Sequence, residues 1–169
     1  MHNSIKNYED INSAIKTKLE DQKINLIPKI IAVSKTFNLE KILPLIKYGH
    51  LDYGENKVQE ALDKWADIKQ KNSNIRLHLI GKLQTNKVKF ALKIFDYIHS
   101  VDSFKLAKKI ADEQKKLNKQ VKIFIQINIG SEEQKSGINK DQTKDLLNFC
   151  KESNLDVIGL MCIPPANEE

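Results

Sequence analysis

The sequence has no long hydrophobic run and very little cysteine. None of its apolar runs approaches the roughly 18 residues of a membrane span, and residues 1–25 carry no continuous apolar segment of the signal-peptide type. The two cysteines, Cys150 and Cys162, lie on different predicted elements and lack the spacing of a metal site. These absences predict a soluble, cytoplasmic protein with reduced thiols and no membrane partner.

The sequence also lacks a concentrated block of positive charge. Its 28 Lys and Arg residues against 22 Asp and Glu give a net charge of +6, spread along predicted helix faces. No strand interleaves basic and aromatic residues in the manner of RNA-recognition modules, so we expect no nucleic-acid partner. A basic module that binds RNA or acidic partners stays an alternative. Salt-sensitive binding that survives the loss of Lys35 would indicate it.

The chain does contain short apolar strands that alternate with amphipathic helices. Its 169 residues suit one domain. Strands that alternate with helices at this spacing predict βα units and a parallel sheet. The predicted strands cover residues 29–34, 50–53, 75–80, 97–101, 121–129 and 156–161.

Two architectures accommodate about six βα units. A doubly wound sheet is one, but no G-x-G-x-x-G turn follows the first strand. A barrel is favoured because polar residues recur on one face of successive strands, and a barrel lumen tolerates them near its mouth. These residues are Lys35, His78, Gln126 and Asn128. Complete barrels start at roughly 200 residues, so we predict an α/β fold that is an incomplete TIM-type (β/α)8 barrel.

Lys35 is the first candidate for chemistry. Strand alternation puts Ile31, Val33 and Lys35 on one face, so that the apolar residues fill the barrel interior and the lysine emerges at its carboxyl-terminal rim. Barrel enzymes place their reactive groups there. We expect the lysine to be partly removed from water, which favours the uncharged amine that a Schiff base requires. A lysine that merely extends into solvent is the alternative.

An ordered set of short segments resembles the pyridoxal phosphate homeostasis proteins, which themselves resemble the barrel domain of alanine racemase. The matching segments are IAVSKT at 31–36, YGENKVQE at 53–60, HLIGKLQTNK at 78–87, HSVDS at 99–103, QIN at 126–128, KSG at 135–137 and GLM at 159–161. No segment is specific alone, but their order and spacing follow the family over essentially the whole chain.

The resemblance implies that residues 1–169 form a single barrel domain that binds pyridoxal 5′-phosphate as a Schiff base on Lys35. Asn56, His78 and Met161 are implied to bind the cofactor as well. From the residues alone, Asn56 could instead cap the following helix, and His78 could be a buried histidine whose hydrogen bonds are satisfied. The family's role in intracellular cofactor homeostasis implies cofactor-dependent apoenzymes as partners and a monomeric full-length form.

The family continues beyond the sixth strand of this chain. Its later strands supply a phosphate-binding loop and an arginine near the pyridine nitrogen, so the resemblance identifies the chain as C-terminally truncated. We expect open apolar edges at strands one and six, and therefore marginal stability and a tendency to aggregate. The functional alternative is a cofactor-dependent enzyme such as an amino-acid racemase. The sequence offers no second acid or base for that chemistry, so a cofactor carrier is expected.

Overall fold

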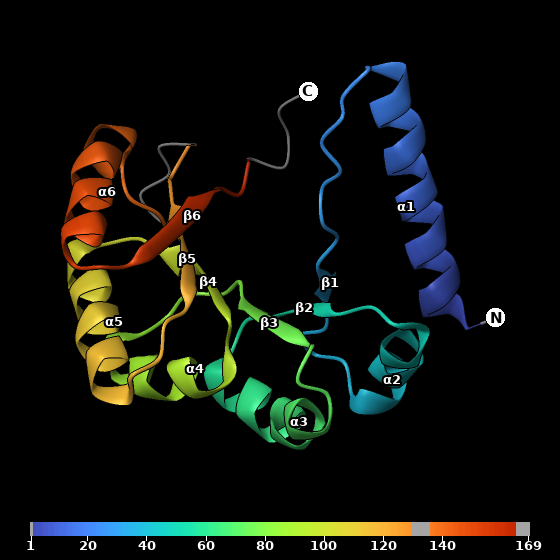
Figure 1. Ribbon diagram of the computed structural model, residues 1–169, viewed down its shortest axis with the longest axis horizontal. Coiled ribbons are helices and arrows are strands. Elements are labelled where there is room, and N and C mark those ends of the chain that lie inside the picture. The colour runs from blue at the N-terminus through green and yellow to red at the C-terminus, as the bar shows by residue number, and fades with distance from the viewer. Residues whose placement is uncertain (1, 130–135, 165–169) are drawn as a thin grey trace.

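The computed structural model describes residues 2–129 and 136–164, in which six strands alternate with helices (Figure 1). The strands are β1 Ala32–Val33, β2 Asp52–Glu55, β3 Arg76–Leu79, β4 Tyr97–Val101, β5 Lys122–Gln126 and β6 Asp156–Met161. The α-helices are α1 Asn3–Asp21, α2 Leu39–Tyr48, α3 Val58–Lys71, α4 Val88–Ile94, α5 Phe104–Leu117 and α6 Thr143–Glu152. Two short 3₁₀ helices, η1 Thr85–Lys87 and η2 Lys140–Gln142, precede α4 and α6.

All six predicted strands exist, although their lengths differ from the predictions. Strands β4 and β6 have the predicted bounds, whereas β1 keeps only two of its six predicted residues. Within the described residues β1 pairs with β2 alone, through Ala32 opposite Tyr53 and Val33 opposite Gly54. The prediction of a long first strand was wrong because apolar character sets which residues favour a strand, whereas the neighbouring strand sets how many of them pair.

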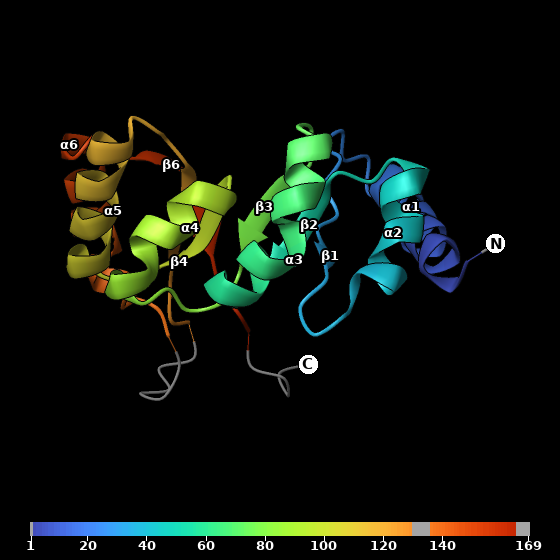
Figure 2. The same cartoon turned by 90° about the horizontal axis from the view of Figure 1, so that it is seen from below.

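The strand order distinguishes the two architectures that the sequence left open. The sheet runs β1-β2-β3-β4-β5-β6, and each strand is parallel to the one before it. A doubly wound sheet reverses its strand order at a switch point, and this sheet does not. Figure 1 shows a curved sheet with α2 to α6 around its outer side, and Figure 2 shows α3 and α4 covering that side. The fold is an incomplete barrel, as predicted.

The two faces of the sheet differ in chemistry. On the outer face, Tyr53, Leu77, Ile98 and Ile123 from four successive strands have no exposed surface. Trp65 of α3 packs there against the Tyr53 ring, with 4.8 Å between the ring centroids. Strand alternation then directs the intervening residues to the inner face, which would be the lumen of a closed barrel. The hydrophobic core therefore lies between the sheet and its outer helices.

The inner face is not filled with apolar side chains at β1, contrary to expectation. Val33 is 47% exposed, because no described segment covers the inner side of this edge strand. At the opposite edge, Ile158 and Leu160 of β6 are 43% and 58% exposed. Among the described helices, none is both long and apolar enough to cross a bilayer.

The exposed edge of β6 generates a prediction about aggregation. Replacing Leu160 with lysine puts a charge on an edge strand that pairs on one side only in the described chain. We expect Leu160→Lys to delay the onset of aggregation in light-scattering measurements. Because the side chain is largely exposed, the free energy of unfolding should change by no more than about 0.5 kcal/mol.

The matched control for this variant is Gln70→Lys, which adds the same charge on the exposed surface of α3. If Gln70→Lys delays aggregation as much as Leu160→Lys does, net charge is the cause and the β6 edge is not the site of association.

Candidate functional site

The carboxyl-terminal ends of the strands surround a cavity of about 390 Å³. This volume is within the range of roughly 300–1,000 Å³ that is typical of small-molecule sites. Its lining combines two lysines with amide, hydroxyl and apolar groups. The lining residues are Lys35, Asn56, Ile80, Gly81, Lys82, Gln126, Ile127, Asn128, Ser136 and Ile163. Two of the four predicted site residues, Lys35 and Asn56, are therefore brought together here.

Lys35 follows β1 and contributes its side chain to the cavity. The preceding residue, Ser34, is buried and bonds to Glu55 on the helix side of the sheet, so the predicted alternation places Lys35 on the inner side. The expectation that Lys35 is partly removed from water was wrong, since the residue is exposed. The physical reason is the open inner face at this edge, which leaves the rim in contact with solvent.

Asn56 lies one residue beyond β2 and carries an unsatisfied acceptor. Its Oδ1 atom is buried and has no hydrogen-bond partner within the described residues. The alternative that Asn56 caps the next helix is wrong, because Lys57 is the N-cap of α3 and no side chain caps it. A buried acceptor without a partner costs free energy. A ligand that donates a hydrogen bond in the cavity would remove that cost.

Gly81 allows the segment after β3 to approach Asn56 closely. A Cβ atom at Gly81 would overlap the backbone oxygen of Asn56 and lie 2.8 Å from its Cα. This close approach brings Lys82 to the cavity as a second amine. Lys82 was not predicted as a cavity residue. The available signal was its place directly after a glycine at the end of a strand, where a barrel gathers its functional groups.

His78 lies deeper in the inner face and does not line this cavity. Its Nε2 atom is 3.0 Å from Asp52 Oδ1, and its Nδ1 atom is 2.9 Å from His99 Nε2. The Tyr97 ring stacks on His78 at 4.3 Å, and the Phe124 ring stacks on His99 at 4.2 Å. With both ring nitrogens bonded, His78 has the surroundings of a satisfied buried histidine.

The pKa shifts of Asp52, His78 and His99 determine which of these hydrogen-bonded side chains carries a proton. Burial raises the pKa of the Asp52 carboxyl, but hydrogen bonds from Arg76 and His78 outweigh it and lower the pKa to about 2. Burial lowers the pKa of His99 to about 4, with His78 adding to the effect. Burial likewise lowers the pKa of His78, against its bond to Asp52. With Asp52 ionised and both rings neutral, His78 donates to Asp52 and accepts from His99.

The remaining predicted residues lie elsewhere. Met161 ends β6 opposite Gln126, where its carbonyl accepts a hydrogen bond from the Ile127 N–H at 2.9 Å, and it is not among the cavity residues. Lys135, in the segment that matches the family's KSG motif, lies outside the described residues. In the described part of the chain no group of three or more His, Cys, Asp or Glu side chains could hold a metal ion.

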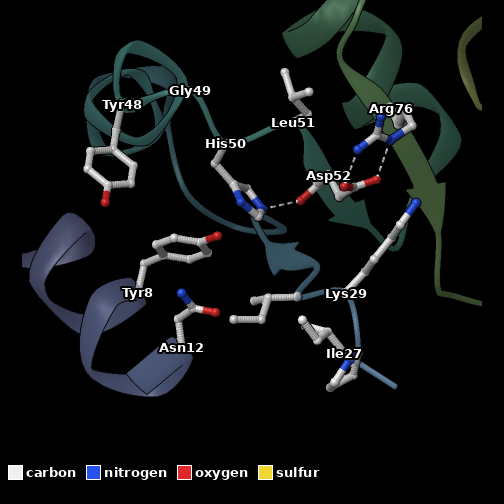
Figure 3. A pocket seen from close by; sticks show the side chains of 12 residues that line it. Tyr8, Asn12, Ile27, Lys29, Tyr48, Gly49, His50, Leu51, Asp52 and Arg76 are labelled. Atoms are coloured by element: carbon white, nitrogen blue, oxygen red, sulfur yellow. Dashed lines mark hydrogen bonds and ion pairs between the residues drawn. The ribbon is translucent and has the colours of Figure 1, made fainter. Parts of the chain in front are cut away.

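A second pocket, of about 350 Å³, lies at the opposite end of the strands (Figure 3). Residues before β1 and β2, the start of β3, and α1 line it. In Figure 3 the Tyr8 ring lies beside His50, and the Lys29 side chain extends toward the Asp52–Arg76 pair. Arg76 donates two hydrogen bonds of 2.6 Å to Asp52. None of the four predicted site residues lines this pocket. The amino-terminal end of a barrel serves stability rather than chemistry.

Comparisons with known proteins agree with this geometry. The family model for the alanine racemase N-terminal domain matches residues 13–169. A pyridoxal phosphate homeostasis protein of Vibrio alginolyticus is 33% identical over 94% of the chain and 70% of its own length. That of Aquifex aeolicus is 39% identical over 81% of the chain and 60% of its own length. The chain thus spans about 60% of the Aquifex relative.

Solved structures show the same likeness in three dimensions. PipY of Synechococcus elongatus without pyridoxal phosphate is 32% identical and superimposes with a TM-score of 0.77, covering 92% of the chain and 73% of PipY. PipY with pyridoxal phosphate bound gives a TM-score of 0.75 at 32% identity, covering 91% of the chain and 72% of PipY. An alanine racemase of Clostridium difficile, at 18% identity and a TM-score of 0.66, covers 91% of the chain and 41% of that enzyme, and shares the fold.

The buried histidines generate a prediction about pH. The unfolded chain protonates His99 near pH 6.5, whereas the folded protein does so only near pH 4. The stability supplied by the neutral ring is therefore complete above about pH 6.5 and is lost as pH falls toward 4. At about 1.4 kcal/mol per pKa unit, the loss is at most roughly 3.5 kcal/mol. We expect urea unfolding midpoints to fall across this window and to fall less in His99→Gln.

The control is His2→Gln, which removes an exposed histidine at the start of α1. This variant should keep the pH dependence of the parent. An unchanged dependence in His99→Gln would show that other groups cause the acid sensitivity.

Proposed function

The chain belongs to the pyridoxal phosphate homeostasis proteins of the alanine racemase N-terminal domain family, and we propose on this premise that it binds pyridoxal 5′-phosphate and takes part in intracellular homeostasis of that cofactor. The observation that carries the proposal is the cavity at the carboxyl ends of the strands, where the exposed amine of Lys35 and the unpaired Oδ1 atom of Asn56 line the same space. The pyridoxal phosphate bound in the PipY structure supports the same class of ligand for this chain.

The residues present fit such a ligand. Lys35 would hold such a cofactor covalently, because its amine could form a Schiff base with the cofactor aldehyde and one water molecule would be released. Lys35 Nζ has no hydrogen bond or ion pair with another described residue, so a ligand displaces none of these residues from it. Asn56 offers an acceptor to a donor on the ligand. The buried amide of Gln126 forms part of the cavity wall and donates to the Ser136 carbonyl at 3.1 Å, which holds the following segment against the site.

The wider assignment follows the family. We propose that the domain acts in the cytoplasm, that it carries the cofactor rather than turning over a substrate, and that cofactor-dependent apoenzymes receive it. His78 supports the inner face through Asp52 and His99. Met161 lies opposite Gln126 in the sheet, and the contact with the cofactor that the resemblance implies for it stays a prediction.

Covalent labelling tests the proposal directly. We expect incubation with pyridoxal phosphate, followed by borohydride reduction and peptide mass spectrometry, to modify Lys35 with near one-to-one stoichiometry. Lys35→Ala should abolish this labelling. Lys82→Ala is the matched control, because Lys82 lines the same cavity and is also exposed.

Labelling scattered over many lysines and unchanged in Lys35→Ala would overturn the proposal. If the loaded chain also exchanges the α-proton of an amino acid with solvent, the protein is a cofactor-dependent enzyme of the racemase type and not a carrier.

Asn56 provides a second test. Its Oδ1 atom has no partner among the described residues, so truncation to alanine removes little from that part of the folded state. A hydrogen bond to the ligand is worth about 0.5–1.5 kcal/mol, and we therefore expect Asn56→Ala to weaken cofactor binding by roughly 2- to 12-fold. Absorbance titration with pyridoxal phosphate measures the affinity. Gln84→Ala, in the exposed segment beyond Lys82, is the control and should bind like the parent.

A further inference from the structure

Lys35 lies in a tight turn whose backbone is under strain. The Phe37 N–H donates to the Ser34 carbonyl at 3.2 Å, which places Lys35 and Thr36 at the two central positions. Thr36 has φ of 66°, in the left-handed region that a turn normally fills with glycine or asparagine. A β-branched residue in this region is an outlier that persists only where its surroundings hold it.

Strand pairing ends before it reaches this turn. The last hydrogen bond from β1 toward β2 is the Ser34 N–H to the Gly54 carbonyl, at 2.9 Å. The regular strand itself has only two residues. The sheet therefore fixes Ser34, and something else must fix the turn that carries the reactive amine.

Two side chains of α3 bind the peptide groups on either side of Lys35. Lys64 Nζ donates to the Ser34 carbonyl at 2.9 Å, which belongs to the peptide group before Lys35. The Thr36 N–H, which belongs to the peptide group after Lys35, donates to Glu60 Oε1 at 3.1 Å. Glu60 and Lys64 are four residues apart on one helix face, with 3.7 Å between Nζ and Oε1.

The side chain of Glu55 accepts hydrogen bonds from Lys64 and from Ser34, the residue before Lys35. The residue has no exposed surface, and its Oε1 atom accepts from Ser34 Oγ at 2.7 Å, Lys64 Nζ at 3.0 Å and Trp65 Nε1 at 2.9 Å. A buried carboxylate is costly unless donors satisfy it. The three donors all bind Oε1, whereas Oε2 is buried without a partner among the described residues. Through these bonds Glu55 connects β2 to the segment before Lys35 and to α3.

We propose that Glu55, Glu60 and Lys64 form a backbone clamp that positions Lys35 toward the cavity. Glu60 and Lys64 bind the peptide groups on either side of Lys35, and Glu55 binds the Lys64 amine and the Ser34 hydroxyl. None of the three lines the cavity. They are positioning residues. The clamp rests on the proposed function for its purpose, since a fixed backbone lets a flexible side chain present its amine at one place.

The test uses Glu60, whose side chain is 32% exposed, so that the variant is expected to fold. Glu60→Ala removes the acceptor of the Thr36 N–H, whereas Glu60→Gln keeps an amide oxygen in its place. Asp63→Ala is the matched control, because it removes an exposed carboxylate of the same helix whose partner is Gln59. Circular dichroism melting establishes that each variant is folded.

Two readouts report on the clamp without the cofactor. In Glu60→Ala we expect amide exchange at Thr36, followed by NMR, to accelerate by about tenfold or more, because a local opening becomes easier. We also expect the rate of Lys35 acylation by acetic anhydride, relative to Lys82 in the same sample, to change by at least about threefold. Glu60→Gln should restore both values toward the parent, and Asp63→Ala should leave both unchanged.

Unchanged Thr36 exchange or an unchanged Lys35-to-Lys82 ratio in Glu60→Ala overturns the clamp, as does an equal effect of Asp63→Ala. Failure of the proposed function is a separate result. In that case the parent chain does not label at Lys35 with pyridoxal phosphate, whatever the exchange and acylation data show.

Discussion

The parallel pairing of each strand with its predecessor is the constraint on which the rest of the structure depends. Parallel neighbours need long crossover connections, and the common handedness of those connections puts the helices on one side of the sheet. That side becomes the apolar core. Because every strand runs in the same direction, all carboxyl ends meet at one edge. Lys35, Asn56, Gly81 and Gln126 are therefore neighbours in space, although each belongs to a different strand–helix unit.

The inner face resolves a conflict between burial and polarity. Asp52, His78 and His99 are each less than 10% exposed, and an isolated charge at that depth would be costly. Neighbouring side chains offset this cost, because Arg76 and His78 form hydrogen bonds with the Asp52 carboxylate and His99 forms one with His78. Rings of Tyr97 and Phe124 stack on the two histidines and exclude water from them. The face is held by a connected polar chain rather than by aliphatic layers.

Much of this arrangement could be predicted from the sequence. The alternation of apolar strands with amphipathic helices predicted six parallel strands, which are confirmed, and the carboxyl-end position of Lys35 followed from the alternation of side chains along the first strand. The chain from Asp52 to His99 could not be predicted, because it depends on the register that sets Gly54 opposite His78. Periodicity within one strand carries no information about register between strands. The exposure of Lys35 could not be predicted either, because it depends on which other segments cover the inner face of the sheet.

The described lysines differ in whether their amines are bonded to other residues of the protein. Lys64 directs its amine to Glu55 Oε1 and the Ser34 carbonyl, and Lys69 directs its amine to Asp96 and the Ile94 carbonyl. Both amines are hydrogen-bonded to residues in or beside the strands, and each connects α3 to the sheet. Lys35 makes no such bond in the described chain, although it lies one residue from the Ser34 carbonyl that Lys64 binds. A lysine that forms a bond to a ligand needs first a fixed backbone position and second an amine with no other bonded partner. Glu60 and Lys64 supply the first by binding the backbone on either side of Lys35, and within the described residues its amine has no partner, as the proposed bond to a ligand requires.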